Sequence, residues 1–178
     1  MTDDKKDTAA PLGAVGLLAA LIGRGFGIFA ALAILAVLIL TAINVTGRYL
    51  FTAPLRGAEE MTGFLVVAMV MFGAAEAYRR GDHIRIDLLT ERLGPTGARW
   101  VDILSHIAVA AFAVNLLRTG LHTVAFSRSF GAYSAGYLEI PMWIPQSALV
   151  IGGALLLAMA LLKLIETLLS IAYKDRRP

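Results

Sequence analysis

The stretch RYLFTAPLRGAEEMTGFLVVAMVMFGAAEAYRRGDHIRID, residues Arg48–Asp87, contains a short apolar segment between charged ends. Its centre, Met61–Ala75, is purely apolar for only 15 residues, and carboxylates border it, with Glu59 and Glu60 before it and Glu76 after it. A helix of that core spans about 22 Å, which is short of the roughly 30 Å of a bilayer's hydrocarbon. A membrane span here therefore has to carry its charged ends at the edges of the hydrocarbon.

The composition indicates an integral membrane protein. The 178 residues are 58% hydrophobic and 16% charged, with a mean hydropathy of +0.73, whereas a soluble domain is nearer half apolar and a quarter charged. The chain has no cysteine, which excludes disulfides, Cys-ligated metals and thiol catalysis. The net charge of +3 suits basic cytoplasmic loops better than nucleic-acid binding.

Four long apolar blocks predict transmembrane helices at about Phe26–Thr46, Glu60–Tyr78, Arg99–His122 and Met142–Leu162. Because a helix satisfies its backbone hydrogen bonds internally, we expect an all-α integral membrane protein with four transmembrane helices. Trp100 and Trp143 open the third and fourth blocks, as is typical of residues at a membrane interface. Apolar character continues to Ala172, so the last helix is expected to project beyond the bilayer.

The positive charges predict the orientation. Twelve of the 16 Lys and Arg residues lie in the N-terminal tail, the second loop and the C-terminal end, and four lie on the other side. Since Lys and Arg accumulate in cytoplasmic loops, we expect both termini in the cytoplasm. We expect residues 1–24 to form a cytoplasmic tail and a surface-lying or tilted lead-in helix, residues 25–172 the four-helix membrane domain, and residues 173–178 a cytoplasmic tail.

The second loop has a helical pattern of its own. Apolar residues recur at helical spacing opposite charged ones, with Ile86, Leu89 and Leu93 opposite Arg85, Glu91 and Arg92. This pattern predicts a short amphipathic helix on the inner membrane surface, which ends at Gly94-Pro95, where the third span begins. An ordinary polar loop is the alternative.

Charged residues outside the second span are close enough to neutralise its first turn. Glu59 and Glu60 lie at the helix N-terminus, where the helix dipole favours negative charge, and Arg48 and Arg56 are their expected partners. Two interpretations are open for this cluster. It either anchors a solvated helix end or faces a partner subunit, because a short span with charged ends suits burial against protein.

The other end of the second span has local partners for its carboxylate. Arg79 and Arg80 follow Glu76 at i+3 and i+4, so they can pair with it on one side of a helix. We therefore expect an ion-paired helix end at the edge of the hydrocarbon.

The third span is polar for a helix that faces lipid. Helical spacing places its polar residues on two separate faces, one with Asp102, Ser105 and His106 and the other with Asn115, Arg118 and His122. They either form hydrogen bonds within the bundle or contribute to an intersubunit surface. A proton or ion relay is disfavoured, because its groups would be aligned on one face.

Three segments resemble the small membrane subunit of tripartite ATP-independent periplasmic (TRAP) transporters, the DctQ-like small permease. RYLFTAPLRGAEE resembles that family's first-loop signature, RRGDHIRIDLL its loop after the second helix, and YLEIPMWIP its Ile-Pro-x-Trp segment before the fourth helix. The likeness runs in the family's order from about Gly25 to Leu169. Family members often carry Trp where this chain has Gly57, so the contact made there is expected to differ.

The resemblance implies a non-enzymatic scaffold subunit without a cofactor, in the bacterial inner membrane. Its implied partners are the bilayer, a large membrane subunit with the substrate and sodium sites and an elevator-like motion, and a periplasmic binding protein that delivers an organic acid; no nucleic acid is implied. The motif residues expected at the subunit interface are Arg48, Tyr49, Phe51, Pro54, Leu55, Glu59, Glu60, Arg79, Arg80, His83, Asp87, Pro141 and Trp143.

Two other membrane functions are alternatives. A haem-bearing or structural anchor of a respiratory enzyme is disfavoured because His83 lies in a loop, and His106 and His122 lie about 24 Å apart along one helix. A small self-sufficient oligomeric exporter would need an ionisable group near mid-depth in the first helix, and Phe26–Ile43 has none. The sequence also shows no pair of broken half-helices of the kind that forms a transporter's site.

Overall fold

The computed structural model describes residues 9–80 and 87–174, which form four helices. These are α1, Ala9–Leu50; α2, Ala58–Arg80; α3, Asp87–Ser129; and α4, Trp143–Lys174. Each contains a stretch that is long and apolar enough to cross a membrane. The prediction of an all-α membrane protein with four transmembrane helices is confirmed.

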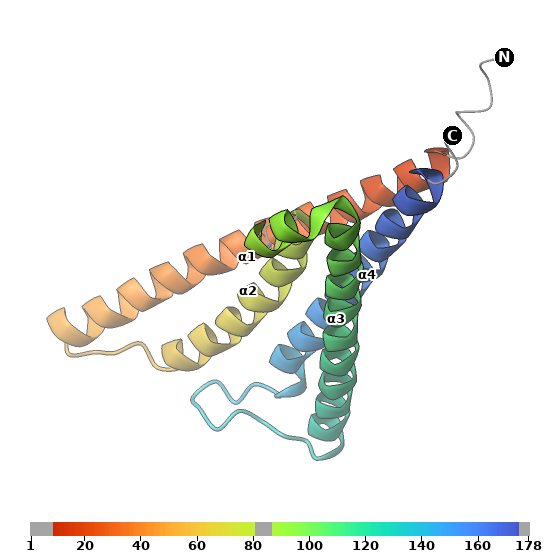
Figure 1. Cartoon of the computed structure of the whole chain (residues 1–178). Coiled ribbons are helices and arrows are strands. Elements are labelled where there is room, and N and C mark those ends of the chain that lie inside the picture. The colour runs from red at the N-terminus through yellow and green to blue at the C-terminus, as the bar shows by residue number, and fades with distance from the viewer. Residues whose placement is uncertain (1–8, 81–86, 175–178) are drawn as a thin grey trace.

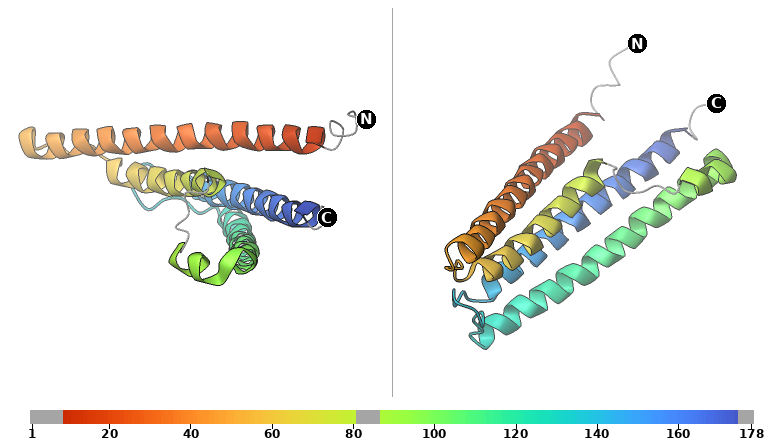
Figure 2. Two further views of the ribbon diagram at one scale, coloured as in Figure 1. Left: turned by 45° about the horizontal axis from the view of Figure 1, so that its top comes forward. Right: turned by 90° about the vertical axis from the view of Figure 1, so that its left-hand side faces the viewer.

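The helices lie side by side in the order α1, α2, α4, α3 (Figure 2). The Ala9 end of α1 and the Lys174 end of α4 lie at one end of the bundle (Figure 1). The connections 51–57 and 130–142 lie at the opposite end, which we call the loop end. Because α1 packs mainly on α2, and α3 mainly on α4, these two outer helices leave most of their surface exposed.

Two adjacent glycines allow α4 to lie between its neighbours. A Cβ atom on Gly152 would lie 2.6 Å from the Cβ atom of Met71 in α2, and one on Gly153 would lie 3.3 Å from the backbone nitrogen of Leu117 in α3. Small residues let membrane helices pack with their backbones close together. The buried side chains of the bundle form two clusters, one of Tyr78, Ala113, Leu156, Met159 and Ala160, and the other of Ala30, Phe72 and Ala148.

The charged residues at both ends of the second span belong to the helix itself. α2 has 23 residues, so it is about 35 Å long and exceeds the hydrocarbon thickness. Glu59 and Glu60 occupy its first turn, and Arg79 and Arg80 its last turn. The short apolar core is therefore flanked by helical turns that suit the two edges of a membrane.

The predicted lead-in helix is not a separate element. α1 runs without interruption from Ala9 to Leu50, about 63 Å, so the lead-in is an extension of the first span. Pro11 does not break it, because a proline in the first turn of a helix removes no hydrogen bond that the helix would make. A single Arg24 in an apolar run does not break it either.

The predicted amphipathic helix is likewise part of a longer helix. Its described residues form the first turns of α3, and Figure 1 shows these turns running crosswise to the rest of α3. The prediction that Gly94-Pro95 ends a helix is wrong, since α3 continues through both residues. A proline inside a helix commonly bends it without ending it. The location of these turns on a membrane surface stays a prediction.

Candidate functional site

The loop end of α2 presents an exposed ion pair. Gly57, with φ of +80°, turns the chain into α2. Two residues later, Glu59 accepts a hydrogen bond from the guanidinium of Arg48, the last basic residue of α1, at 2.6 Å. The side chains are 51% exposed at Arg48 and 79% exposed at Glu59. The predicted pairing of Arg48 with this carboxylate is confirmed, and the pair is accessible from outside the bundle.

Glu60 binds the α3–α4 connection and not an arginine. Its carboxylate accepts hydrogen bonds from the hydroxyl of Ser134 and from the backbone N–H of Leu138, the latter at 3.1 Å. Arg48 and Arg56 were expected from the sequence as partners for Glu59 and Glu60, but the guanidinium of Arg56 lies over the ring of Tyr137, 5.0 Å from the centroid. Glu60 therefore fastens α2 to a loop that follows it by more than 70 residues.

The α3–α4 connection is held in a defined shape. Backbone hydrogen bonds join its two sides, and Tyr133 lies opposite Pro141 in an isolated antiparallel pair. The guanidinium of Arg128 stacks over the ring of Trp143 at 4.4 Å, which links the end of α3 to the start of α4. Both family-motif residues of this segment, Pro141 and Trp143, thus have contacts within the chain.

A tryptophan at position 57, which the family often has there, would require the side chain of Leu138 to move. A Cβ atom on Gly57 would lie 2.8 Å from the Cγ atom of Leu138. In addition, its positive φ is one that other residues rarely adopt. In this chain, the α3–α4 connection therefore packs directly against the backbone that precedes α2.

Asn44 fixes the connection after α1. It is 9% exposed, and its Oδ1 atom accepts a hydrogen bond from the N–H of Leu55 at 3.0 Å. Tyr49 and Phe51 lie beyond it with 78% and 70% of their surface exposed, and Pro54 is exposed as well. Sequence reasoning assigned Asn44 no role, although a lone amide in an apolar run is a signal for a buried hydrogen bond.

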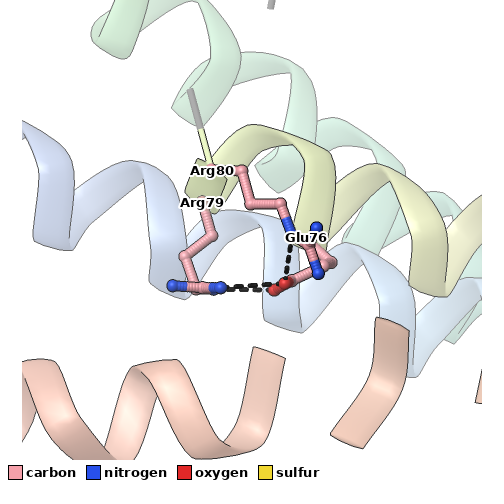
Figure 3. A network of polar contacts seen from close by, with 3 residues as sticks. All are labelled: Glu76, Arg79 and Arg80. Carbon is pink, nitrogen blue, oxygen red and sulfur yellow. Dashed lines mark hydrogen bonds and ion pairs between the residues drawn. The ribbon is translucent and has the colours of Figure 1, made fainter. Parts of the chain in front are cut away.

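The other end of α2 carries a buried carboxylate with two arginines (Figure 3). Arg79 approaches the Glu76 carboxylate with two nitrogen atoms at 2.6 and 2.8 Å, and Nε of Arg80 lies at 2.7 Å. α1 covers this group closely, since a Cβ atom on Gly27 would lie 2.9 Å from Cγ of Glu76, and one on Gly23 would lie 2.5 Å from its Oε2. The predicted pairing is confirmed, and its burial under α1 is an additional finding.

The first polar group of α3 lies on one face of the helix. His106 turns toward α2, where its Nδ1 atom lies 2.6 Å from the hydroxyl of Tyr78, and Asp102 is half-buried. Ser105 lies at the exposed edge of the same face. His122 is exposed on the opposite side of α3 from His106. Within the described chain, these two imidazoles therefore do not form a facing pair of the kind that ligates haem.

The second polar group of α3 faces away from the bundle. Asn115, Arg118 and His122 are exposed, opposite the buried Ala113 and Gly120 on the α4 side. Arg118 has no hydrogen bond or ion pair within the part of the chain that the structure describes. A charge near the membrane centre costs about 2.5–3.5 kcal/mol on insertion scales. Of the two alternatives for these residues, the structure supports an outward-facing surface.

The contacts described above do not involve two of the family-motif residues, His83 and Asp87. His83 lies outside the described residues, and Asp87 is the first residue of α3. Among the described residues, no group of three His, Asp or Glu side chains is placed to hold a metal ion. The structure brings Arg48 and Glu59 together, attaches Glu60 to the α3–α4 connection, pairs Pro141 with Tyr133 within that connection, and places Trp143 under Arg128 of α3. That the motif residues form a subunit interface stays a prediction.

Comparison with known proteins gives matches over the membrane helices. Residues 37–170 match the model of the family described as the DctQ component of tripartite ATP-independent periplasmic transporters. The "C4-dicarboxylate TRAP transporter small permease protein DctQ" of Rhodobacter capsulatus is 32% identical over 122 residues, which cover 66% of this chain and 53% of that protein. The "Putative TRAP transporter small permease protein" of Haemophilus influenzae is 23% identical over 130 residues, 73% of this chain and 79% of that protein.

The matched region contains the features that define the site. It extends from the first span through the loop end, both charged ends of α2 and nearly all of α4. The chain spans about half the length of the Rhodobacter capsulatus relative. The family match covers well over half of this chain, and the described residues include four helices that are long and apolar enough to cross a membrane. The chain therefore belongs to the DctQ family, the small permease component of TRAP transporters.

Proposed function

We propose that this chain is the scaffold subunit of a sodium-driven transporter that takes up an organic acid. It binds a large permease subunit, which receives the substrate from a periplasmic binding protein. The chain lies in the bacterial inner membrane with both termini in the cytoplasm. The observation that carries this proposal is the family match over residues 37–170.

The architecture supports a scaffold. Each of the four spans is one helix, whereas substrate sites of secondary transporters are typically formed by discontinuous helices near the membrane midplane. The close contact of Gly152 with Met71 holds α4 against α2, and the hydrogen bond from Leu138 to Glu60 holds α2 to the α3–α4 connection. These contacts make the bundle a rigid surface for a partner. The exposed Arg48–Glu59 pair and the outward-facing residues of α3 provide groups for a partner to bind.

Reconstitution into liposomes tests the proposal. The liposomes carry an inward sodium gradient and receive a binding protein loaded with a labelled carboxylate. We expect uptake only when this chain and the large permease are both present. The chain alone is expected to give the same signal as empty liposomes, because it would not contain the substrate site.

Two outcomes would contradict the proposal. Saturable uptake by this chain alone would favour a self-sufficient transporter. Full, stable uptake by the large permease alone would show that the chain is not needed as a scaffold. Collapse of the sodium gradient with an ionophore is the matched control, since it should abolish uptake while leaving the complex intact.

A further inference from the structure

The outer side of α3 carries a narrow polar stripe. Asn115, Arg118 and His122 lie within one arc of the helix, and the exposed Ala111 and Ala125 continue the same arc on either side. We call these five residues the α3 stripe. The small alanines at its two ends leave room for another helix to approach the backbone.

The stripe lies deep in the span. Trp100, which is 69% exposed, marks one edge, and Arg128 stacked on Trp143 marks the other edge at the loop end. At the rise of a helix, Arg118 is about 15 Å from Arg128 and about 27 Å from Trp100. Arg118 therefore lies about a third of the way between these two edges, inside the hydrocarbon and nearer the loop end. An arginine at a helix end can extend its side chain to the interface, but Arg118 is not at an end.

The other outer helix has no such feature. The exposed side chains of α1 between Ile28 and Ile43 are apolar except for the uncharged Thr41, and they include Leu32, Leu35 and Ile39. This composition is the one expected of a surface that contacts lipid. Since α1 and α3 are equally peripheral in the bundle, the polar stripe is a specific property of α3 and not of outer helices in general.

We infer that the α3 stripe docks against a transmembrane helix of the large permease, and that this helix presents a carboxylate to Arg118. The inference rests on the proposed function, which supplies a membrane-embedded partner. A carboxylate is the acceptor that matches a guanidinium in two parallel hydrogen bonds. Such a pair neutralises the charge at a depth where water is absent.

Two other occupants fit the stripe less well. A second copy of this chain, docked by the same surface, would place two Arg118 guanidiniums close together, because a two-fold contact is self-complementary. A lipid phosphate would have to lie about 15 Å below the ring of Trp143, far from its headgroup layer. A different protein with an acidic group in a membrane helix is therefore favoured.

Photo-crosslinking in the intact transporter tests the contact. A benzophenone amino acid is placed at Asn115 in the stripe, or at Leu35 on the apolar side of α1 as the matched control. We expect a crosslink to the large permease from position 115 and none from position 35. With the wild-type complex intact, crosslinks from position 115 only to lipid or to a second copy of this chain would overturn the inference and leave the proposed function standing. Failure of the wild-type chain to bind the large permease would refute the proposed function itself.

Charge changes test the chemistry. Arg118→Glu is expected to lower recovery of the large permease with this chain at least about tenfold, as in the loss of a desolvated ion pair. Replacing the Asp or Glu of the crosslinked helix with Arg should restore recovery in that variant. Arg118→Leu should lower recovery as well, but raise the yield of this chain expressed alone, because it removes an unpaired charge from lipid. A complex with Arg118→Glu that forms as in wild type would overturn the inference, and Arg24→Glu at an exposed position of α1 serves as the control for the charge change.

Discussion

Glu59 and Glu60 are adjacent and chemically identical, but they have different surroundings. Glu59 shares an exposed ion pair with Arg48, whereas Glu60 accepts hydrogen bonds from Ser134 and Leu138 of the α3–α4 connection. Exposed ion pairs contribute little to stability, because water solvates both charges well. Loss of an acceptor from a partly buried network costs more, since it leaves a donor without a partner.

We expect Glu60→Gln to lower the stability of the isolated chain by about 1–3 kcal/mol, whereas Glu59→Gln should have little effect. Thermal unfolding in detergent measures this difference. The order should reverse when recovery of the large permease is measured, because Arg48 and Glu59 are proposed to be available for a partner. Equal behaviour of the two variants in both assays would contradict the separate roles.

The residue-level contacts differ in how far the sequence could predict them. The pairing of Glu76 with Arg79 and Arg80 follows from helical spacing alone, and so it was predictable. The partners of Glu60 lie on a loop that packs only after α3 and α4 are in place. Charge complementarity suggested an arginine, Arg48 or Arg56, for that carboxylate, but it accepts hydrogen bonds from neutral donors of the loop instead.

At the element scale, the contact between α1 and α2 depends on where glycines lie along α1. Gly23 and Gly27 pack against the Glu76 group, whereas Gly25 between them has open space beside it. The aromatic rings of Phe26 and Phe29 then pack on Phe72 of α2. The sequence alone does not distinguish these three glycines. Their roles differ because Gly23 and Gly27 lie on the side of α1 that faces α2, whereas Gly25 does not.

Alanine substitution should distinguish the two kinds of glycine. Gly27→Ala is expected to destabilise the chain by about 1–3 kcal/mol, because the new methyl group overlaps Cγ of a buried glutamate. Gly25→Ala should be neutral or stabilising by up to about 1 kcal/mol, because alanine favours the helix. Thermal unfolding of both variants checks the prediction, and a destabilised Gly25→Ala would contradict it.

Hydropathy predicted the four spans but not their limits. The apolar blocks identify which segments cross a membrane, because burial in hydrocarbon requires that composition. Helical structure continues past those blocks wherever the backbone permits it, as in α1 before Phe26 and in α3 before Trp100. The sequence therefore divided two long helices that the structure shows as continuous.

At the scale of the whole molecule, the order α1, α2, α4, α3 is not apparent from hydropathy. All four spans are apolar, and the choice of neighbours depends on matching glycines such as Gly152 and Gly153 to surfaces far away in the chain. The orientation, in contrast, is predicted by the distribution of Lys and Arg. That distribution predicts that the loop end lies in the periplasm.

Single cysteines test that orientation cleanly, because the chain has none of its own. Ala53→Cys and Ala135→Cys lie in exposed positions of the loop end and should react with an impermeant maleimide in spheroplasts. Thr90→Cys should react only after the membrane is permeabilised. The cysteine-free chain is the control, and the opposite labelling pattern would reverse the proposed topology.

The central position of α4 has a consequence for biosynthesis. Helices leave the ribosome in chain order, so α3 enters the membrane before the helix on which it mainly packs has been made. During that interval, the small residues that later face α4, Gly120 among them, border lipid or the insertion machinery. The bundle is thus complete only when α4, the last helix, has been synthesised. A chain that ends before Trp143 would lack this helix and would be a substrate for membrane quality control.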